Sequence, residues 1–366
     1  MTDRRIPATT THWAVAKCIL SQLFAARIGN VRLYQTLLDA YDICKKTVDI
    51  DAYENILFKA LGDALQSNLK NARPLVLVVD GLDEAVSGQA TLLNQLKGAT
   101  RNVSNLKLIV LASDKQAAAV TDTAVHITPE LTLEDVDAVT RRVFTQDQAF
   151  NQIPEAQRET VVTRIAKAAN GSFLWAKLAA KEARDEAAHN HQPLTKVVDK
   201  LIKSKCSITD MVSHRLQSKI PEEGKKILSW LVIIARPLTV HELSDLLSVQ
   251  LDKGTIGEKE KNPLRFLKDA ASLVFCHNEM VYLRHGQIRD AVADSLAKSS
   301  STVISHADLA QRLLLYIKRN VTGASEPSLT PLGTQASLDL LARHRLLGFA
   351  LRYWVSHVQK AFGCTT

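Results

Sequence analysis

Three acidic side chains that follow one apolar run are the residues best placed to do chemistry in this sequence. The run LVLVVD ends in Asp80, and Asp83 and Glu84 come within the next four residues. A carboxylate fixed at the carboxyl end of a buried strand can hold a hydrated Mg²⁺, and a second carboxylate beyond it can orient an attacking water. The alternative is structural, because Asp-Gly often only turns the chain after a strand. From these residues alone, a magnesium and phosphate site and a solvated turn are equally open.

The elements around this motif are those of an α/β domain. Residues 75–80 form a continuous, β-branched run, which predicts a strand buried on both faces, as in a parallel sheet covered by helices. Similar runs at 106–113 and 124–129 predict two more strands, and Gln89–Ala99 suits a helix between the first two. This order of strand, helix, strand and strand is typical of nucleotide-type α/β domains.

The rest of the chain predicts mostly helices. Helical periodicity covers the first 70 residues. After Pro129 the expected helices are 132–144, 155–169, 172–187, 195–203, 207–218, 222–235, 303–319 and 336–361. Residues 264–297 differ, because a helix, a short hairpin over 272–285 and another helix follow one another there, which is typical of a winged-helix fold. The predicted fold class is therefore α/β followed by mostly α, with an incomplete parallel sheet.

The hydropathy excludes an integral membrane protein, and the cysteine spacing does not indicate a zinc site. The formal net charge is 46 − 38 = +8, and residues 151–366 alone carry 30 basic and 21 acidic side chains, a balance of +9. The longest apolar runs, such as LVLVV and WLVIIA, are too short to span a bilayer. The five cysteines show no C-x-x-C pair or zinc-like spacing. We therefore expect a cytoplasmic protein without a membrane span.

Several motifs in a fixed order resemble those of one family. The segment VVDGLDEA resembles the Walker B motif of P-loop NTPases. Four later segments add to this: ANGSFLWAKL at 169–178, ILSWLVIIARPLTVHELSDLL at 227–247, VYLRHGQIRDAV at 281–292 and LLGFALRYWVSHVQKAF at 346–362. Together they resemble the NACHT-type signal-transduction (STAND) NTPases, especially the fungal nephrocystin-3-like group, over most of the chain from about Thr11.

The resemblance implies a division of the chain into four segments. Residues 1–130 would be a partial NACHT-type nucleotide domain, and residues 131–205 a helical domain. Residues 206–300 would be a winged-helix-like domain, and 301–366 a C-terminal helical segment.

The resemblance also implies a switch that holds ADP when closed and exchanges it for ATP, with Mg²⁺, when open. Asp80 would bind the Mg²⁺, and Glu84, with Asp83 beside it, would polarise water.

Other nucleotide contacts are implied further along the chain. Ser113 would follow the next strand, and Gly171 and Phe173 would lie against the adenine. Phe173 could instead pack in the core. His285 would sense the β-phosphate, although a histidine after a strand is often only a structural hydrogen-bonding group.

Two departures from the family pattern weaken the nucleotide site. No G-x-x-x-x-G-K-[ST] occurs, so the loop whose N–H groups and lysine hold the phosphates is missing, together with a central strand. Ala112-Ser113-Asp114 stands where the family commonly has T-S-R, and a carboxylate there would repel phosphate. We therefore expect at best a weak or defunct NTPase that acts through protein partners or self-association. Strands 106–112 and 124–128 must then pair directly or leave an edge exposed.

Two other readings stay open. The chain could be a piece of a complete ATP/ADP-regulated switch whose phosphate loop lies upstream. It could also be a winged-helix protein that binds nucleic acid, which the +9 balance of residues 151–366 favours and the family resemblance disfavours.

Overall fold

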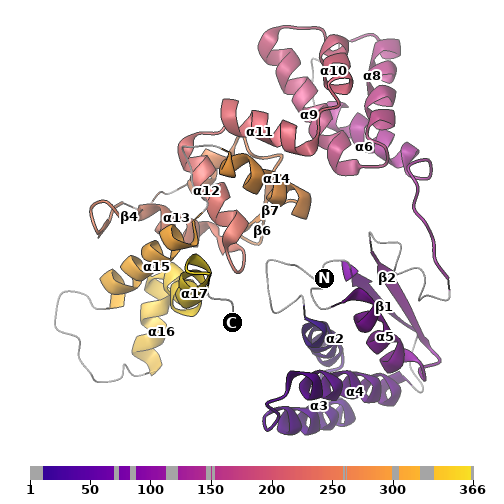
Figure 1. Ribbon diagram of the computed structural model, residues 1–366, viewed down its shortest axis with the longest axis vertical. Coiled ribbons are helices and arrows are strands. Elements are labelled where there is room, and N and C mark those ends of the chain that lie inside the picture. The colour runs from indigo at the N-terminus through magenta and orange to yellow at the C-terminus, as the bar shows by residue number, and fades with distance from the viewer. Residues whose placement is uncertain are drawn as a thin grey trace. The chain divides into compact units, whose positions relative to one another are not determined.

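The chain folds into two units, each with its own hydrophobic core. The computed structural model describes residues 11–69, 74–82, 88–112, 123–145, 150, 153–258, 260, 262–298, 305–321 and 334–363 (Figure 1). Contacts divide the chain into residues 1–126 and 127–366. This division lies close to the predicted boundary at 130. One core runs through the second unit from Val136 to Ala350. The predicted division into four segments, with boundaries at 130, 205 and 300, stays a prediction.

The first unit is a layer of helices on a small parallel sheet. Its elements are α2 (His12–Ala26), α3 (Val31–Cys44), α4 (Ile50–Leu69), β1 (Leu75–Asp80), α5 (Gln89–Thr100) and β2 (Leu106–Leu111). The strands β1 and β2 pair in parallel, from Leu75 opposite Leu106 to Asp80 opposite Leu111, and α5 forms the crossover between them (Figure 1). The first two predicted strands and the helix between them are thus confirmed.

The described residues cover only one face of this sheet, so the prediction of burial on both faces was wrong. Alternate residues of β1 and β2, such as Leu77 and Leu108, pack on the helices. The opposite face is exposed, with Val76 50%, Val78 54%, Ile109 45% and Leu111 45% accessible. A continuous apolar run does not distinguish a strand buried on both faces from one whose second face is left uncovered.

The predicted third strand was also wrong. Residues 124–128 adopt neither helix nor strand, and Val125 and Ile127 are 81% and 72% exposed. Within the described residues, β1 and β2 are each other's only strand partners in this sheet. Of the two outcomes expected for an incomplete sheet, direct pairing of 106–112 with 124–128 is therefore not observed among the described residues.

The second unit begins with helices at nearly all of the predicted places. They are α6 (Leu133–Thr145), α8 (Glu155–Ala168), α9 (Phe173–Asn190), α10 (Leu194–Lys203), α11 (Ile208–Ser218) and α12 (Glu222–Ile233). Apolar residues at helical spacing bury one face of each, as in α10, whose Leu194, Val197, Val198 and Leu201 all lie in the core.

A small antiparallel sheet follows α12. The elements of this region are β3 (Leu238–Thr239), α13 (Val240–Ser248), β4 (Val249–Gln250), β5 (Thr255–Ile256), the 3₁₀ helix η3 (Pro263–Leu267), β6 (Val274–His277), β7 (Met280–Leu283) and α14 (Gly286–Ala297). The strands β4 and β5 pair with each other in a separate two-stranded sheet. The strand order is β3-β7-β6, and β6 and β7 form the predicted hairpin. Asn278 and Glu279 both have positive φ at its tip, as a tight hairpin turn requires. The helix expected before the hairpin is the short η3.

The chain ends in the helices α15 (His306–Val321), α16 (Thr334–Arg343) and α17 (Arg345–Ala361). The single helix expected over 336–361 is therefore two, separated at His344. Where α15 packs on α17, the Nδ1 atoms of His306 and His357 lie 2.7 Å apart. His357 is 1% exposed. None of the described helices is long and apolar enough to cross a bilayer.

Candidate functional site

Asp80 ends β1 at the carboxyl edge of the sheet. Its side chain is exposed, and Gly81 follows with φ of 76°, a left-handed conformation that glycine adopts without strain. Leu82 then turns back into the core, where it is fully buried. The Asp-Gly turn is therefore real, and it leaves a carboxylate at the strand end where a Mg²⁺ ligand could stand.

The other residues predicted for this edge lie outside the described residues. They are Asp83, Glu84 and Ser113. Within the described residues, no three His, Cys, Asp or Glu side chains converge to form a metal site. Since Mg²⁺ is often held by one or two carboxylates and the phosphates of its nucleotide, Asp80 could supply one ligand but not a complete site.

Gly171 and Phe173 lie at the start of α9. Gly171 has φ of 81°, and a Cβ there would stand 3.2 Å from Cα of Pro129 and from Oγ1 of Thr132, so the close packing requires glycine. Ser172 caps α9 by accepting a hydrogen bond from the backbone N–H of Trp175 at 3.1 Å. Phe173 is 41% exposed, so its ring is not part of the core.

His285 caps α14. Its Nδ1 accepts a hydrogen bond from the backbone N–H of Gln287 at 3.1 Å, which makes it a structural hydrogen-bonding group. Nδ1 therefore carries no proton in this arrangement, and Nε2–H is the donor that an anion could use. The imidazole is exposed.

Arg284, the residue before His285, lies near two lysine side chains, Lys177 and Lys181. Burial, Arg284 and Lys177 lower the pKa of Lys181 to about 8. Burial, Arg284 and Arg142 also lower the pKa of Lys177. No carboxylate of the described residues pairs with Lys177 or Lys181. A bound anion would relieve this repulsion between like charges.

In the neighbouring network around Glu182, by contrast, the cationic side chains are paired with carboxylates. Arg215 donates to Oε2 of Glu182 at 2.7 Å and to Oδ2 of Asp185 at 3.0 Å. Burial alone would raise the pKa of Glu182, but Arg215 and Lys219 outweigh it and hold this pKa below its usual value. This network joins α9 to α11 and is structural.

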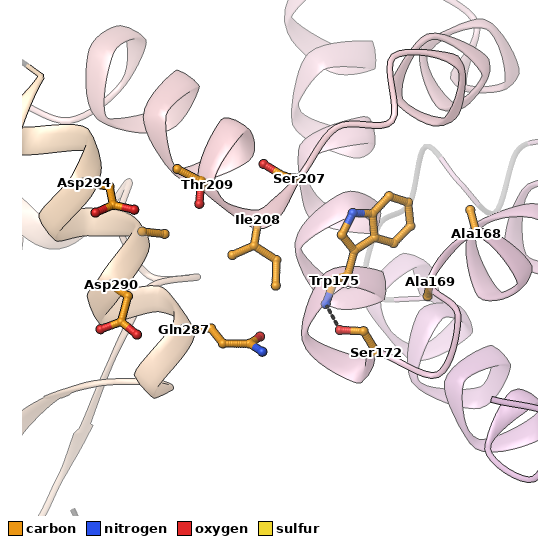
Figure 2. Close-up of a pocket in the computed structure, with 11 residues that line it drawn as sticks. Ala168, Ala169, Ser172, Trp175, Ser207, Ile208, Thr209, Gln287, Asp290 and Asp294 are labelled. Carbon is orange, nitrogen blue, oxygen red and sulfur yellow. Dashed lines mark hydrogen bonds between the residues drawn. The ribbon is translucent and has the colours of Figure 1, made fainter. Parts of the chain in front are cut away.

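A pocket of about 520 Å³ lies where α9, α11 and α14 meet (Figure 2). The pocket is lined by Ala168, Ala169, Ser172, Trp175, Ser207, Ile208, Thr209, Gln287, Asp290, Ala291 and Asp294. Ser172 lies between Gly171 and Phe173, and Gln287 lies two positions after His285. These three neighbours are all predicted site residues. The structure thus brings these two segments together, which sequence order alone did not predict.

The chemistry of this pocket does not favour phosphate. Asp290 and Asp294 stand one turn apart on α14 and would repel it (Figure 2). Trp175 packs against the core of the second unit, is half-buried at the pocket and donates from Nε1 to the carbonyl of Cys206 at 2.7 Å. Asp290 lies in the VYLRHGQIRDAV motif, but no local signal in the sequence indicates that it lines a pocket.

Comparison with known proteins matches one part of the chain. Residues 2–113 match the family model described as "Nephrocystin 3, N-terminal". No curated protein matches the chain. The matched residues end two positions after β2 and therefore cover the helices, the sheet and Asp80. The chain is thus similar to the nephrocystin-3 N-terminal domain over residues 2–113.

Proposed function

We propose that this chain is a NACHT-type nucleotide-switch signalling module that lacks independent ATPase activity and acts through protein contacts, including self-association. One observation carries the proposal. Asp80 stands at the carboxyl end of a parallel strand, as a Walker B acid would, within the segment that matches the nephrocystin-3 family model. Yet the sequence contains no phosphate-binding loop.

The second unit gives limited support. The cations Lys177, Lys181 and Arg284 repel one another, which would favour an anion bound among them. The pocket beside this region is acidic, so a nucleotide would gain little from it. Recognition of phosphate without tight binding fits a degenerate switch.

Calorimetric titration of the full chain with ADP and ATP, with and without Mg²⁺, tests the proposal. We expect any binding to be weaker than about 1 mM. Asp80→Ala removes the proposed Mg²⁺ ligand, and Asp63→Ala removes an exposed carboxylate of α4 as a matched control. Micromolar binding that is lost in Asp80→Ala and kept in Asp63→Ala would show a working site and contradict the degenerate reading.

A second candidate is a piece of a complete ATP/ADP-regulated switch. The exposed apolar face of β1 and β2 favours it, because parallel sheets are ordinarily covered on both faces and a two-stranded sheet is a poor stable unit. Additional strands and helices would cover Val76, Val78, Ile109 and Leu111. Intact mass measurement of the native protein decides between the two, since a mass of 40.4 kDa would exclude further chain.

A further inference from the structure

Helix α3 has two apolar faces, of which only one is packed against the part of the chain that the structure describes. Leu33 and Ala40 are buried against the core of the first unit. The outward face carries Val31, Tyr34, Leu38 and Tyr41, which are 77%, 51%, 37% and 62% exposed. We call these four residues the α3 seam.

The spacing of the α3 seam is that of a helix pair. Its residues are separated by three, four and three positions, the a and d pattern with which one helix packs along another. Asn30 caps the helix by accepting from the N–H of Leu33 at 3.1 Å, and the buried face holds α3 on its unit. The seam is therefore presented on a preformed helix, which lowers the entropy lost on association.

We propose that the α3 seam is a dimer interface, on which α3 of a second copy of this chain packs in antiparallel orientation. A two-fold axis level with Thr36 places Val31 opposite Tyr41 of the second copy and Tyr34 opposite Leu38 of the second copy. Each layer then pairs one aromatic ring with one aliphatic side chain. A parallel pair would instead stack like residues on each other.

Charge favours the same arrangement. Arg32 lies in the N-terminal half of α3, and Asp39 and Asp42 lie in the C-terminal half, on the same side of the seam. In the antiparallel pair, Arg32 of each copy approaches Asp42 of the other, so the contact forms twice by symmetry. Lys45 continues the line of the seam beyond Tyr41 and limits the register of the pair. Sliding the two helices by one heptad would place Lys45 opposite Tyr34.

The area is sufficient for a moderate dimer. With about 150–250 Å² for each fully exposed aromatic side chain, the α3 seam offers roughly 450 Å² per copy. Ile28, which is 80% exposed and lies three residues before Val31, would bring a symmetric pair to roughly 1,200 Å² by joining the contact, which is the lower limit of specific stable interfaces. We therefore expect a dissociation constant in the micromolar range. The proposal gives a surface to the self-association proposed above, yet it does not depend on nucleotide binding.

Sedimentation equilibrium of the full chain tests the interface between about 1 and 100 µM, a range that brackets micromolar affinity. Reductant is present because Cys18 and Cys276 are exposed. Tyr34→Glu should weaken the dimer at least about tenfold. Val48→Glu, which changes a residue that is 96% exposed and lies off the seam, should leave it unchanged. Circular dichroism verifies that both variants are folded.

A charge exchange identifies the partner as a second copy in antiparallel orientation. Arg32→Asp should weaken the dimer, and Arg32→Asp combined with Asp42→Arg should restore it to within about threefold, because each new pair again joins opposite charges. A chain that stays monomeric over the whole range would overturn the proposal. So would a dimer that persists in Tyr34→Glu, or a double variant no tighter than Arg32→Asp. Failure here leaves the calorimetric test of nucleotide binding unaffected.

Discussion

The contact between His306 and His357 should make the packing of α17 depend on pH. Only one proton fits between their Nδ1 atoms, which are 2.7 Å apart. Nε2 of His357 is buried and has no hydrogen-bond partner among the described residues. A proton added there would create a buried cation close to Lys360. Burial, His306 and Lys360 accordingly lower the pKa of His357 from 6.5 to about 4.

The magnitude follows from the two pKa values of His357. Between pH 6.5 and about pH 4 the unfolded chain binds a proton that the folded chain does not, so stability is complete above pH 6.5 and falls as the pH decreases. At pH 5, linkage gives a loss of about 2 kcal/mol relative to pH 7.5. The pKa of His306 is also lowered, by burial and Lys360, and acts in the same direction. The carboxyl groups contribute little, because pH 5 lies above their ordinary pKa values.

Hydrogen exchange of peptides from α17 measures this effect directly. After correction for the intrinsic pH dependence of exchange, the free energy of opening of residues 345–361 should be about 1–2 kcal/mol lower at pH 5 than at pH 7.5. His357→Phe keeps a ring in the same place and removes the proton site, so most of this difference should disappear. If His357→Phe retained the full pH difference, the reasoning about the buried imidazole would be refuted.

Three further predictions concern the second unit. Arg215→Met should lower the free energy of unfolding by about 3 kcal/mol, because Glu182, 3% exposed, loses its closest cation. Adding Glu182→Leu should recover part of this loss, and equal urea midpoints for Arg215→Met and wild type would contradict it. Thr239→Ala removes the capping box of α13 and should cost about 0.5–2 kcal/mol in thermal unfolding, while an unchanged melting temperature would contradict it. Arg284→Ala should raise the pKa of Lys181 from about 8 and slow its acetylation at pH 8, as mass spectrometry would detect, whereas faster labelling would contradict the assigned repulsion.

Local pattern predicted most of the fold, and tertiary context explains the exceptions. Helices such as α10 and the hairpin of β6 and β7 were predicted correctly, because apolar spacing and turn residues are local signals. The covering of a sheet face is not local. Val76 and Val78 look like core residues in the sequence, but no described element packs on them. Residues 124–128 have strand-like composition, but none of the described strands pairs with them.

The candidate site was predicted less completely. The position of Asp80 at the end of β1 could be predicted from the sequence, because Asp-Gly ends the apolar run. The joint position of Ser172 and Gln287 at one pocket depends on how α9, α11 and α14 pack, which no local pattern contains. The partial burial of Lys181 could not be predicted from the sequence either, since Arg284, which helps to lower its pKa, lies about a hundred residues further along the chain.

The irregular segment 123–128 gives the chain a natural point of cleavage. A protease binds its substrate as an extended strand with free backbone groups, and Val125 and Ile127 already present exposed side chains on such a backbone. Each side of the cut retains a complete core of its own. Limited digestion should therefore yield two long-lived fragments rather than general degradation. A single cut would separate Asp80 and the α3 seam from the pocket and His285, so that the function of each unit could be tested separately.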